Sequence, residues 1–441
     1  MVAPVIDIQK YRKALANIST YKVKGKVTEL TGLVVKAVVP NVRVGELCLI
    51  NSFYRKQPIK AEVVGFKDNS VLLMPLGDLE GIGPGNDVIP TGNCLMVPVG
   101  YELLGRVLDG MGDPLDTDRY GPLATTQFYP VHASPPDPLT RRRITEPISV
   151  GIKAIDAMLT VGEGQRIGLF AAAGVGKSVL MGMIARNTDA DINVICLVGE
   201  RGRELRDFLE QDLGEEGLAR SIVICSTSDQ PSLVRSKAAY AATAIAEYFR
   251  DQGKKVLFVM DSVTRFARAL REIGLAVGEP PARQGFTPSV FSTLPKLLER
   301  SGNSNKGSIT AFYTVLVEGD DMNEPVADEV RSILDGHVIL SRDLANRGQY
   351  PAINVSESIS RVMSHIVDED HLEAARKLKE VVANYEKERD LILIGAYESG
   401  SNPAVDYAIE KIDEVNNFLK QGIEDRIDFE EAVEGLKALF G

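Results

Sequence analysis

Residues 171–178 read AAAGVGKS, and this stretch constrains the fold more strongly than any other part of the chain. A buried strand, RIGLF, precedes it, and a helical segment, VLMGMIAR, follows it. In this strand–loop–helix context, backbone N–H groups at the start of the helix can close around phosphate oxygens. We therefore predict a nucleotide site formed by Gly174, Val175, Gly176, Lys177, Ser178 and Val179.

Within that site, Lys177 is expected to contact the β and γ phosphates of ATP, and the hydroxyl of Ser178 to ligate Mg²⁺. The usual pattern opens with a glycine where this chain has Ala171. That position mainly requires a small residue, and alanine satisfies the turn if its φ is negative. The loop is therefore predicted to bind ATP although one glycine is missing.

The composition excludes several classes of protein. The chain has 441 residues, which suits two or three domains, and it contains no apolar run long enough to span a membrane. A net charge of −11 argues against broad nucleic-acid binding. The 4 cysteines are widely spaced and the 4 histidines are scattered, which predicts buried thiols in a reducing cytosol and no zinc site. The one dense basic cluster, residues 141–143, is more typical of a salt-bridged turn than of a ligand site.

Residues 1–97 are predicted to form a small N-terminal β-barrel domain that begins with a short amphipathic helix, MVAPVIDIQKYRKALANIS. Five or six strand-length runs alternate with turn signals, among them KGKVTEL, GLVVKAVV, GELCLI, KAEVVGF and SVLLMPL. The last two runs flank Lys67-Asp68-Asn69, which we interpret as a hairpin turn.

Residues 98–367 alternate strands with helices, and residues 368–441 form helices only. The strand candidates are residues 166–171, 192–199, 221–227, 255–261, 309–317 and 337–341. Strands rich in Val, Ile and Leu that alternate with helices predict a parallel sheet covered on both faces. The predicted fold is therefore an α/β P-loop core, preceded by a β-barrel and followed by a C-terminal helical domain.

Two acidic residues follow buried strands of this core. KVLFVMD ends at Asp261, where P-loop enzymes place the acid that holds Mg²⁺ through water. An aspartate at a strand end is often only a cap, but its pairing with the phosphate loop favours the metal role. INVICLVG delivers Glu200 to the same edge of the sheet, where a carboxylate can polarise the attacking water. Taken alone, Glu200 would be a surface acid.

Arg361 lies far along the chain from the phosphate loop, in GQYPAINVSESISRV. If it reached a γ-phosphate, it would stabilise transition-state charge as an arginine finger. Taken alone, an arginine after Ser-Ile-Ser is a surface residue, and only the other three elements make it a candidate.

These four elements, in this order, resemble the catalytic subunits of the rotary ATPase superfamily. The resemblance includes GRVLDGMGDPLD (105–116) and VGIKAIDAMLTVGEGQRIGLF (150–170) and extends over nearly the whole chain. Within the superfamily, the chain is most similar to the protein-export ATPases of flagella and type III secretion. The stretches that carry this likeness are RRRITEP, GERGRELRDFLEQDLG, MDSVTRFARALREIGLAVGEPP and ITAFYTVLVEGDDMNEPVADEVRSILDGHVILSR. AEVVGF, LLMP and ATAIAEYFRD favour the flagellar branch.

The resemblance implies a RecA-like core and a homohexameric ring with ATP at the subunit interfaces. It implies that Arg201 lies near the γ-phosphate, that Tyr350 stacks on the adenine and that Arg361 acts on the neighbour's nucleotide. It also implies a stalk, a regulator and chaperone–substrate complexes as partners, and a cytoplasmic location at the inner face of the membrane. Residues 279–290 would border the central pore, or they would form a simple surface loop.

Three other functions are open. A catalytic subunit of a rotary synthase would require a dissimilar partner, whereas this chain carries both Glu200 and Arg361. Where a synthase presents an acidic loop to its shaft, this chain reads GAYESGSNPAVD (395–406), which favours export. An RNA translocase would need aromatic residues on a basic N-terminal face. A scaffold that only holds ATP would not need a base such as Glu200.

Overall fold

The computed structural model describes residues 23–317, 319 and 321–441. The amphipathic helix predicted at the N-terminus lies outside the described residues. Contacts divide the chain into two compact units, Met1–Leu95 and Met96–Gly441. The domain boundaries expected after residues 97 and 367 stay predictions.

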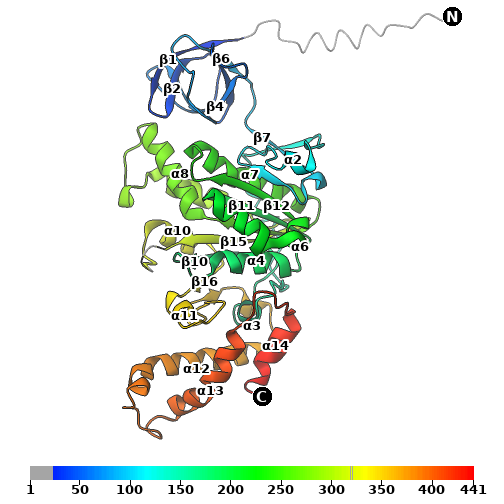
Figure 1. Ribbon diagram of the computed structural model, residues 1–441, viewed down its shortest axis with the longest axis vertical. Helices are drawn as coiled ribbons and strands as arrows, with labels where there is room; N and C mark the ends of the chain where they lie inside the picture. The colour runs from blue at the N-terminus through cyan, green and yellow to red at the C-terminus, as the bar shows by residue number, and fades with distance from the viewer. Residues whose placement is uncertain (1–22, 318, 320) are drawn as a thin grey trace, which may run out of the picture. The chain divides into compact units, whose positions relative to one another are not determined.

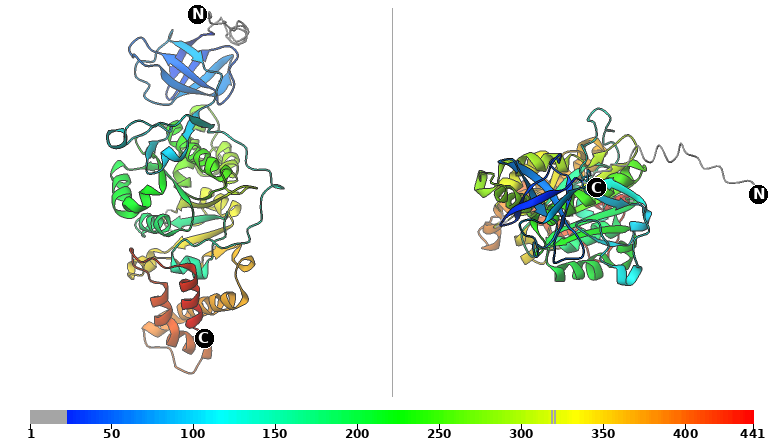
Figure 2. Two further views of the ribbon diagram at one scale, coloured as in Figure 1. Left: turned by 90° about the vertical axis from the view of Figure 1, so that its right-hand side faces the viewer. Right: turned by 90° about the horizontal axis from the view of Figure 1, so that it is seen from above.

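The first unit contains a closed six-stranded barrel, drawn in blue in Figure 2, with the strand order β1-β2-β5-β4-β3-β6. Its strands are β1 (Gly25–Thr31), β2 (Val34–Val38), β3 (Leu47–Asn51), β4 (Ile59–Lys67), β5 (Ser70–Pro75) and β6 (Asp87–Pro90). Lys67 pairs with Ser70, so Asp68 and Asn69 form a two-residue hairpin turn, with φ of 48° and 62°. The turn predicted here is therefore confirmed, and both residues have the positive φ that a type I′ turn requires.

The second unit is built on a nine-stranded sheet with the order β17-β16-β10-β15-β13-β11-β12-β8, to which β14 adds beside β15. Every pairing from β16 to β8 is parallel, as predicted. The strands are β8 (Val107–Asp109), β10 (Arg166–Ala171), β11 (Ile192–Glu200), β12 (Ser221–Thr227), β13 (Lys255–Asp261), β14 (Gly302–Asn303), β15 (Ser308–Leu316), β16 (Gly336–Leu340) and β17 (Ile359–Ser360). A separate pair joins β7 (Met96–Val99) and β9 (Gln127–Pro130). The sequence did not predict β8, β14 or β17, which are only two or three residues long.

Helices cover both faces of the sheet (Figure 1). The helices of this part of the chain are α2 (Thr117–Tyr120), α3 (Lys153–Met158), α4 (Lys177–Asn187), α5 (Gly202–Asp207), α6 (Gly214–Ala219), α7 (Ser232–Asp251), α8 (Val263–Ala276), α9 (Pro288–Leu298), α10 (Pro325–Ile333) and α11 (Arg342–Asn346). The chain then continues into α12 (Glu369–Leu393), α13 (Pro403–Leu419) and α14 (Phe429–Ala438). α7 is followed by Gly253 with φ 82°, which agrees with the helix end predicted there.

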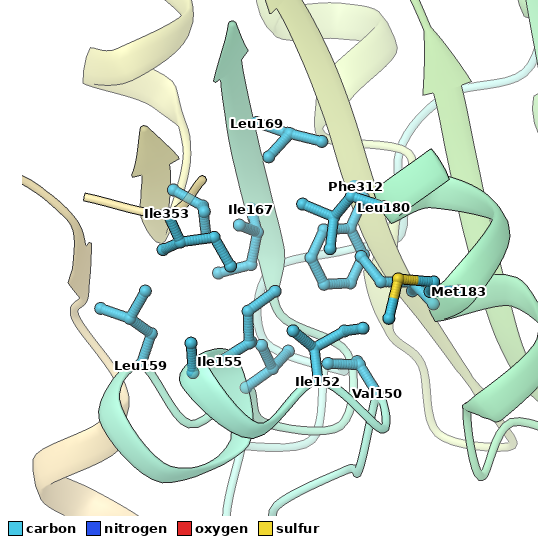
Figure 3. Packing of buried hydrophobic residues seen from close by; sticks show 14 of the residues in the cluster. Val150, Ile152, Ile155, Leu159, Ile167, Leu169, Leu180, Met183, Phe312 and Ile353 are labelled. Carbon is cyan, nitrogen blue, oxygen red and sulfur yellow. The ribbon is translucent and has the colours of Figure 1, made fainter. Parts of the chain in front are cut away.

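The core beneath the phosphate loop is shown in Figure 3. Ile167 and Leu169 of β10 point to one side of the strand, where they meet residues of α3, α4 and β15. All of these residues are almost completely buried: Ile152, Ile155, Leu180, Met183 and Phe312. Because alternate residues of a strand face opposite sides, this packing holds β10 in one orientation and so aims the loop that follows it.

Truncation of this core should destabilise the second unit. Leu169 is 0% exposed, so Leu169→Ala should lower its free energy of unfolding by roughly 2–5 kcal/mol. Leu139 is 96% exposed, and Leu139→Ala is the matched control, with an expected change within about 0.5 kcal/mol. Urea unfolding followed by far-UV circular dichroism is the measurement, because the chain has 0 tryptophans. Equal urea midpoints for both variants would contradict the packing described here.

Candidate active site

The phosphate loop connects the end of β10 to the first turn of α4. Gly174 and Gly176 have φ of 81° and 85°, a region that favours glycine. Among the described residues, the non-glycine positions with positive φ are Asn41, Asp68, Asn69 and Gln284. Ala171 is not one of them, so the missing glycine imposes no backbone strain. Val175, at the centre of the loop, is 2% exposed and anchors the loop in the core.

Lys177 and Asp261 meet across the carboxyl edge of the sheet. The ammonium group of Lys177, at the start of α4, forms an ion pair with the Asp261 carboxylate at the end of β13. Thr314 of β15, the strand between them, donates its hydroxyl to Asp261 Oδ1 at 2.6 Å. Asp261 and Thr314 are almost completely buried, so this carboxylate is held in one place by two neighbouring strands. Sequence reasoning missed Thr314, since a threonine inside a strand carries no distinctive signal.

Glu200 ends β11, the strand next to β13, and is only 9% exposed. Arg265 of α8 pairs with it at 2.5 Å and also donates to the carbonyl oxygen of Gly199 at 2.8 Å. Burial raises the pKa of Glu200 above its usual value, and the nearby Asp261 carboxylate raises it further. Arg265 acts in the opposite direction and limits the rise in the pKa of Glu200. A buried carboxylate with a raised pKa at this edge is suited to accept a proton.

Arg201 extends away from this group. Its side chain is 79% exposed and lies 3.4 Å from Glu204 of α5. The carboxyl groups of Glu204 and Glu200 interact by sharing a proton, which lowers the pKa of Glu204 and raises that of Glu200. Ser178, in the first turn of α4, is exposed. The structure therefore brings Lys177, Asp261 and Glu200 together, with Arg201 at the rim.

A mostly apolar pocket of about 370 Å³ opens beside the phosphate loop. It is lined by Gly174, Val175, Gly176, Val179, Leu180, Met183, Leu340, Tyr350, Pro351, Ala352, Gln421 and Ile423. A Cβ atom added to Gly176 would lie 3.5 Å from the Tyr350 ring, so the predicted adenine residue does lie at this loop. Gln421 and Ile423 come from the segment between α13 and α14. Sequence reasoning missed both, because they lie some 250 residues from the loop they approach.

Arg361 lies at the opposite edge of the sheet. Its N–H donates to the Asp335 carbonyl oxygen at 3.0 Å, and the N–H of Asp335 donates to the Arg166 carbonyl oxygen at 2.9 Å. Arg361 is thus level with the first residue of β10, whereas the phosphate loop follows the last, Ala171. At about 3.3 Å per residue, the two levels are about 16 Å apart along the strand. Arg361 is exposed, and it belongs to a different edge from Lys177 of its own chain.

Two further properties concern metals and membranes. The described part of the chain contains no cluster of three or more His, Cys, Asp or Glu side chains able to hold a metal ion. Magnesium in nucleotide enzymes needs only one or two protein oxygens, since phosphates and water supply the rest, and Ser178 and Asp261 are of this type. Among the same residues, no helix has the length and apolar character of a membrane span.

Comparisons with known proteins identify the family of the chain. Residues 151–360 match the nucleotide-binding domain of the ATP synthase alpha/beta family, and residues 27–92 match its beta-barrel domain. Residues 367–438 match the C-terminal domain of the type III secretion ATPase EscN. The chain is 56% identical to the flagellum-specific ATP synthase of Bacillus subtilis over 96% of each chain. It belongs to the flagellar and type III secretion ATPases of the ATP synthase alpha/beta family.

Other members support the same assignment. The type 3 secretion system ATPase of Xanthomonas euvesicatoria is 52% identical, over 99% of this chain and 98% of that protein. The structure of assembled EscN from enteropathogenic E. coli has a TM-score of 0.87 and 46% identity, over 94% of this chain and 99% of that one. EscN has also been solved in complex with its central stalk EscO, with a TM-score of 0.86. The resemblance, the fold class and the ATPase activity expected from the sequence are confirmed; the roles of individual site residues stay predictions.

Loss of the Tyr350 ring should weaken ATP binding. An aromatic stack contributes about 0.5–1.5 kcal/mol, so Tyr350→Ala should raise the Kd for ATP roughly 2- to 10-fold. Tyr407→Ala is the matched control, since Tyr407 on α13 is 44% exposed and Tyr350 47%. Isothermal titration calorimetry with a non-hydrolysable ATP analogue measures both. An unchanged Kd for Tyr350→Ala would place the adenine elsewhere.

Proposed function

We propose that the chain is the Mg-ATP-hydrolysing motor of a flagellar protein-export apparatus, working as a homohexameric ring with active sites at the subunit interfaces. The observation that carries the proposal is the position of Arg361. One chain has a phosphate site at the carboxyl edge of its sheet and an exposed arginine at the amino edge, about 16 Å away along the strand. A second copy is needed to bring the two together.

Each candidate residue has a distinct role in this proposal. Lys177 contacts the β and γ phosphates, and the N–H groups of residues 174–176 surround them. Glu200 orients and polarises the attacking water, which its burial beside Arg265 suits. Tyr350 and Val179 hold the adenine in the apolar pocket. Arg201, at the rim, approaches the γ-phosphate.

In this proposal, Mg²⁺ and Arg361 of the neighbouring subunit complete the active site. Ser178 and Asp261 would hold Mg²⁺, which neutralises charge on the phosphate oxygens when it is bound. Arg361 of the neighbouring subunit would stabilise the charge that develops on the γ-phosphate, a contribution of about 10³- to 10⁵-fold in P-loop enzymes. Because the charge grows only as the bond breaks, this contact acts on kcat rather than on ATP affinity.

The partners follow from the relatives. EscN was solved with a central stalk, and we infer that a stalk, a regulatory protein and chaperone–substrate complexes also engage this ring. We place it in the cytoplasm, peripheral to the membrane at the export gate, where hydrolysis releases chaperones and prepares substrates for export. The 56% identity to a flagellum-specific relative supports the flagellar branch, and the acidic chain supports partners other than nucleic acid.

The deciding test is specific ATPase activity against protein concentration, at fixed Mg-ATP and without partners. Activity per molecule should rise steeply with concentration, because each site requires two subunits. Arg361→Ala should lower kcat by about 10³-fold or more with little change in KM. Activity that is independent of concentration and of Arg361 would instead indicate a site complete within one chain.

The acid limb of the pH–rate profile should report Glu200. Since its pKa is raised, Glu200 is protonated, and unable to accept a proton, up to a higher pH than an ordinary glutamate. The positive charge of Arg265 lowers the pKa of Glu200, so its removal in Arg265→Gln should raise that pKa and move the acid limb of kcat/KM to still higher pH. Arg206→Gln is the control, because Arg206 is exposed and pairs with Glu210 at 2.7 Å. A shift toward lower pH in Arg265→Gln would exclude Glu200 as the titrating base.

A further inference from the structure

The backbone around Arg361 is held by buried polar groups that the reaction itself does not use. Gln165, which is 0% exposed, precedes β10 and donates its amide to the Asp335 carbonyl oxygen at 3.0 Å and to Ser360 Oγ at 3.1 Å. The Asp335 carbonyl also accepts the N–H of Arg361. Ser360 in turn donates to the carbonyl oxygen of Thr160 at 2.9 Å. The residue before Arg361 and its own N–H are thus both fastened to the start of β10.

A chain of ion pairs also holds Asp335, the residue whose carbonyl oxygen accepts the N–H of Arg361. Arg166 binds the Asp335 carboxylate through two nitrogens, Nε at 2.9 Å and Nη2 at 3.2 Å. Its remaining terminal nitrogen lies 2.5 Å from Glu299, and Glu299 lies 3.3 Å from Arg141. Together, Asp335 and Glu299 hold the pKa of Arg166 above its usual value, so its charge is permanent. Arg141, the first residue of the basic cluster at residues 141–143, therefore belongs to this network of ion pairs.

We propose that Arg166 and Asp335 are positioning residues for Arg361, and that β10 mechanically links the finger to the phosphate loop of its own chain. The proposal rests on the proposed function, in which Arg361 acts on the neighbour's nucleotide. β10 begins at Arg166, which pairs with Asp335, the residue whose carbonyl oxygen accepts the N–H of Arg361, and it ends at Ala171, which opens the phosphate loop. In each subunit, Arg361 is thus connected through Asp335 to the first residue of β10, whose last residue leads into that subunit's own phosphate loop.

Two properties favour positioning over simple stability. The Arg166 side chain is 12% exposed, and burying such a pair costs desolvation that apolar residues of similar volume would avoid. A bidentate guanidinium–carboxylate pair does, however, restrict orientation, which an apolar contact does not. β10 is also suited to act as a rigid element, because Ile167 and Leu169 are packed on one face by the core in Figure 3.

The first test compares steady-state kinetics of the full-length variants. Arg166→Gln and Asp335→Asn should each lower kcat by about 10- to 100-fold, the loss expected from misplacing a catalytic group by about 1 Å, with KM for ATP unchanged. Arg166→Lys keeps the positive charge but cannot bind the carboxylate through two nitrogens, so its kcat should fall less than that of Arg166→Gln. Arg142→Gln is the matched control, since Arg142 donates to the Ser304 carbonyl oxygen at 2.9 Å and should keep parental activity.

The second test is complementation in mixed rings, measured as single-turnover hydrolysis with ATP below the site concentration. Lys177→Ala has a defective phosphate loop and an intact finger. Mixed with Arg166→Gln, it should restore hydrolysis at interfaces where its finger faces the other variant's intact loop. A variant that merely misfolds would not be rescued in this way, and Asp335→Asn provides a second, milder test of the same contact.

The controls separate the two proposals. Arg361→Ala mixed with Lys177→Ala should also regain activity. If that mixture recovers and the Arg166→Gln mixture does not, Arg166 does not act through the finger and the positioning role is wrong. If neither mixture recovers, the trans role of Arg361 in the proposed function is wrong as well. A parental kcat for Arg166→Gln would also overturn the positioning role.

Discussion

The parallel pairing of four strands, β10, β15, β13 and β11, is the constraint on which the site depends. Parallel strands end at the same edge, so residues that follow different strands converge there whatever their distance in sequence. Lys177 lies beyond the end of β10, whereas Asp261 and Glu200 are the last residues of β13 and β11, and the three meet at one edge by this rule. Arg361 lies at the opposite edge because β17, the strand that it follows, pairs antiparallel with β16 and so ends level with Arg166, where β10 begins.

Burial changes the acid–base properties of Glu200, one of the groups that meet at this edge. A carboxylate in water has a pKa too low to accept a proton readily near neutrality, and burial of Glu200 beside Asp261 raises that pKa. The charge of Arg265 acts in the opposite direction and limits this rise in the pKa. Arg265 pairs with Glu200 from α8, and its second contact, to the carbonyl oxygen of Gly199, keeps its side chain in place. The pKa of Glu200, the proposed base, is therefore adjusted by a residue of α8, outside the phosphate loop.

The sequence predicted those parts of the molecule whose signal is local. Buried strands such as residues 221–227 and 255–261 appear with the predicted bounds, because their apolar runs end abruptly at polar residues. The Asp68–Asn69 turn and the phosphate loop could likewise be predicted, because each is determined by a few adjacent residues. Thr314 and Ile423 could not be identified in this way, since each acquires its role only when distant segments are packed together. The position of Arg361 required the antiparallel pairing of β17, a strand of 2 residues with no sequence signature.

The pocket beside the phosphate loop is lined both by the core and by the segment between α13 and α14. Gln421 accepts the N–H of Lys153 at 2.8 Å and donates to the Gly151 carbonyl oxygen at 2.8 Å, so the segment after α13 is tied to the start of α3. Ile423 of that segment lines the same pocket as Tyr350. A ligand shifts a conformational equilibrium only by the difference in its affinity for the two states. In the proposed function adenine occupies this pocket, so a displacement of Ile423 that reshapes the wall would change the affinity for ATP, and by linkage ATP would bias the position of that segment.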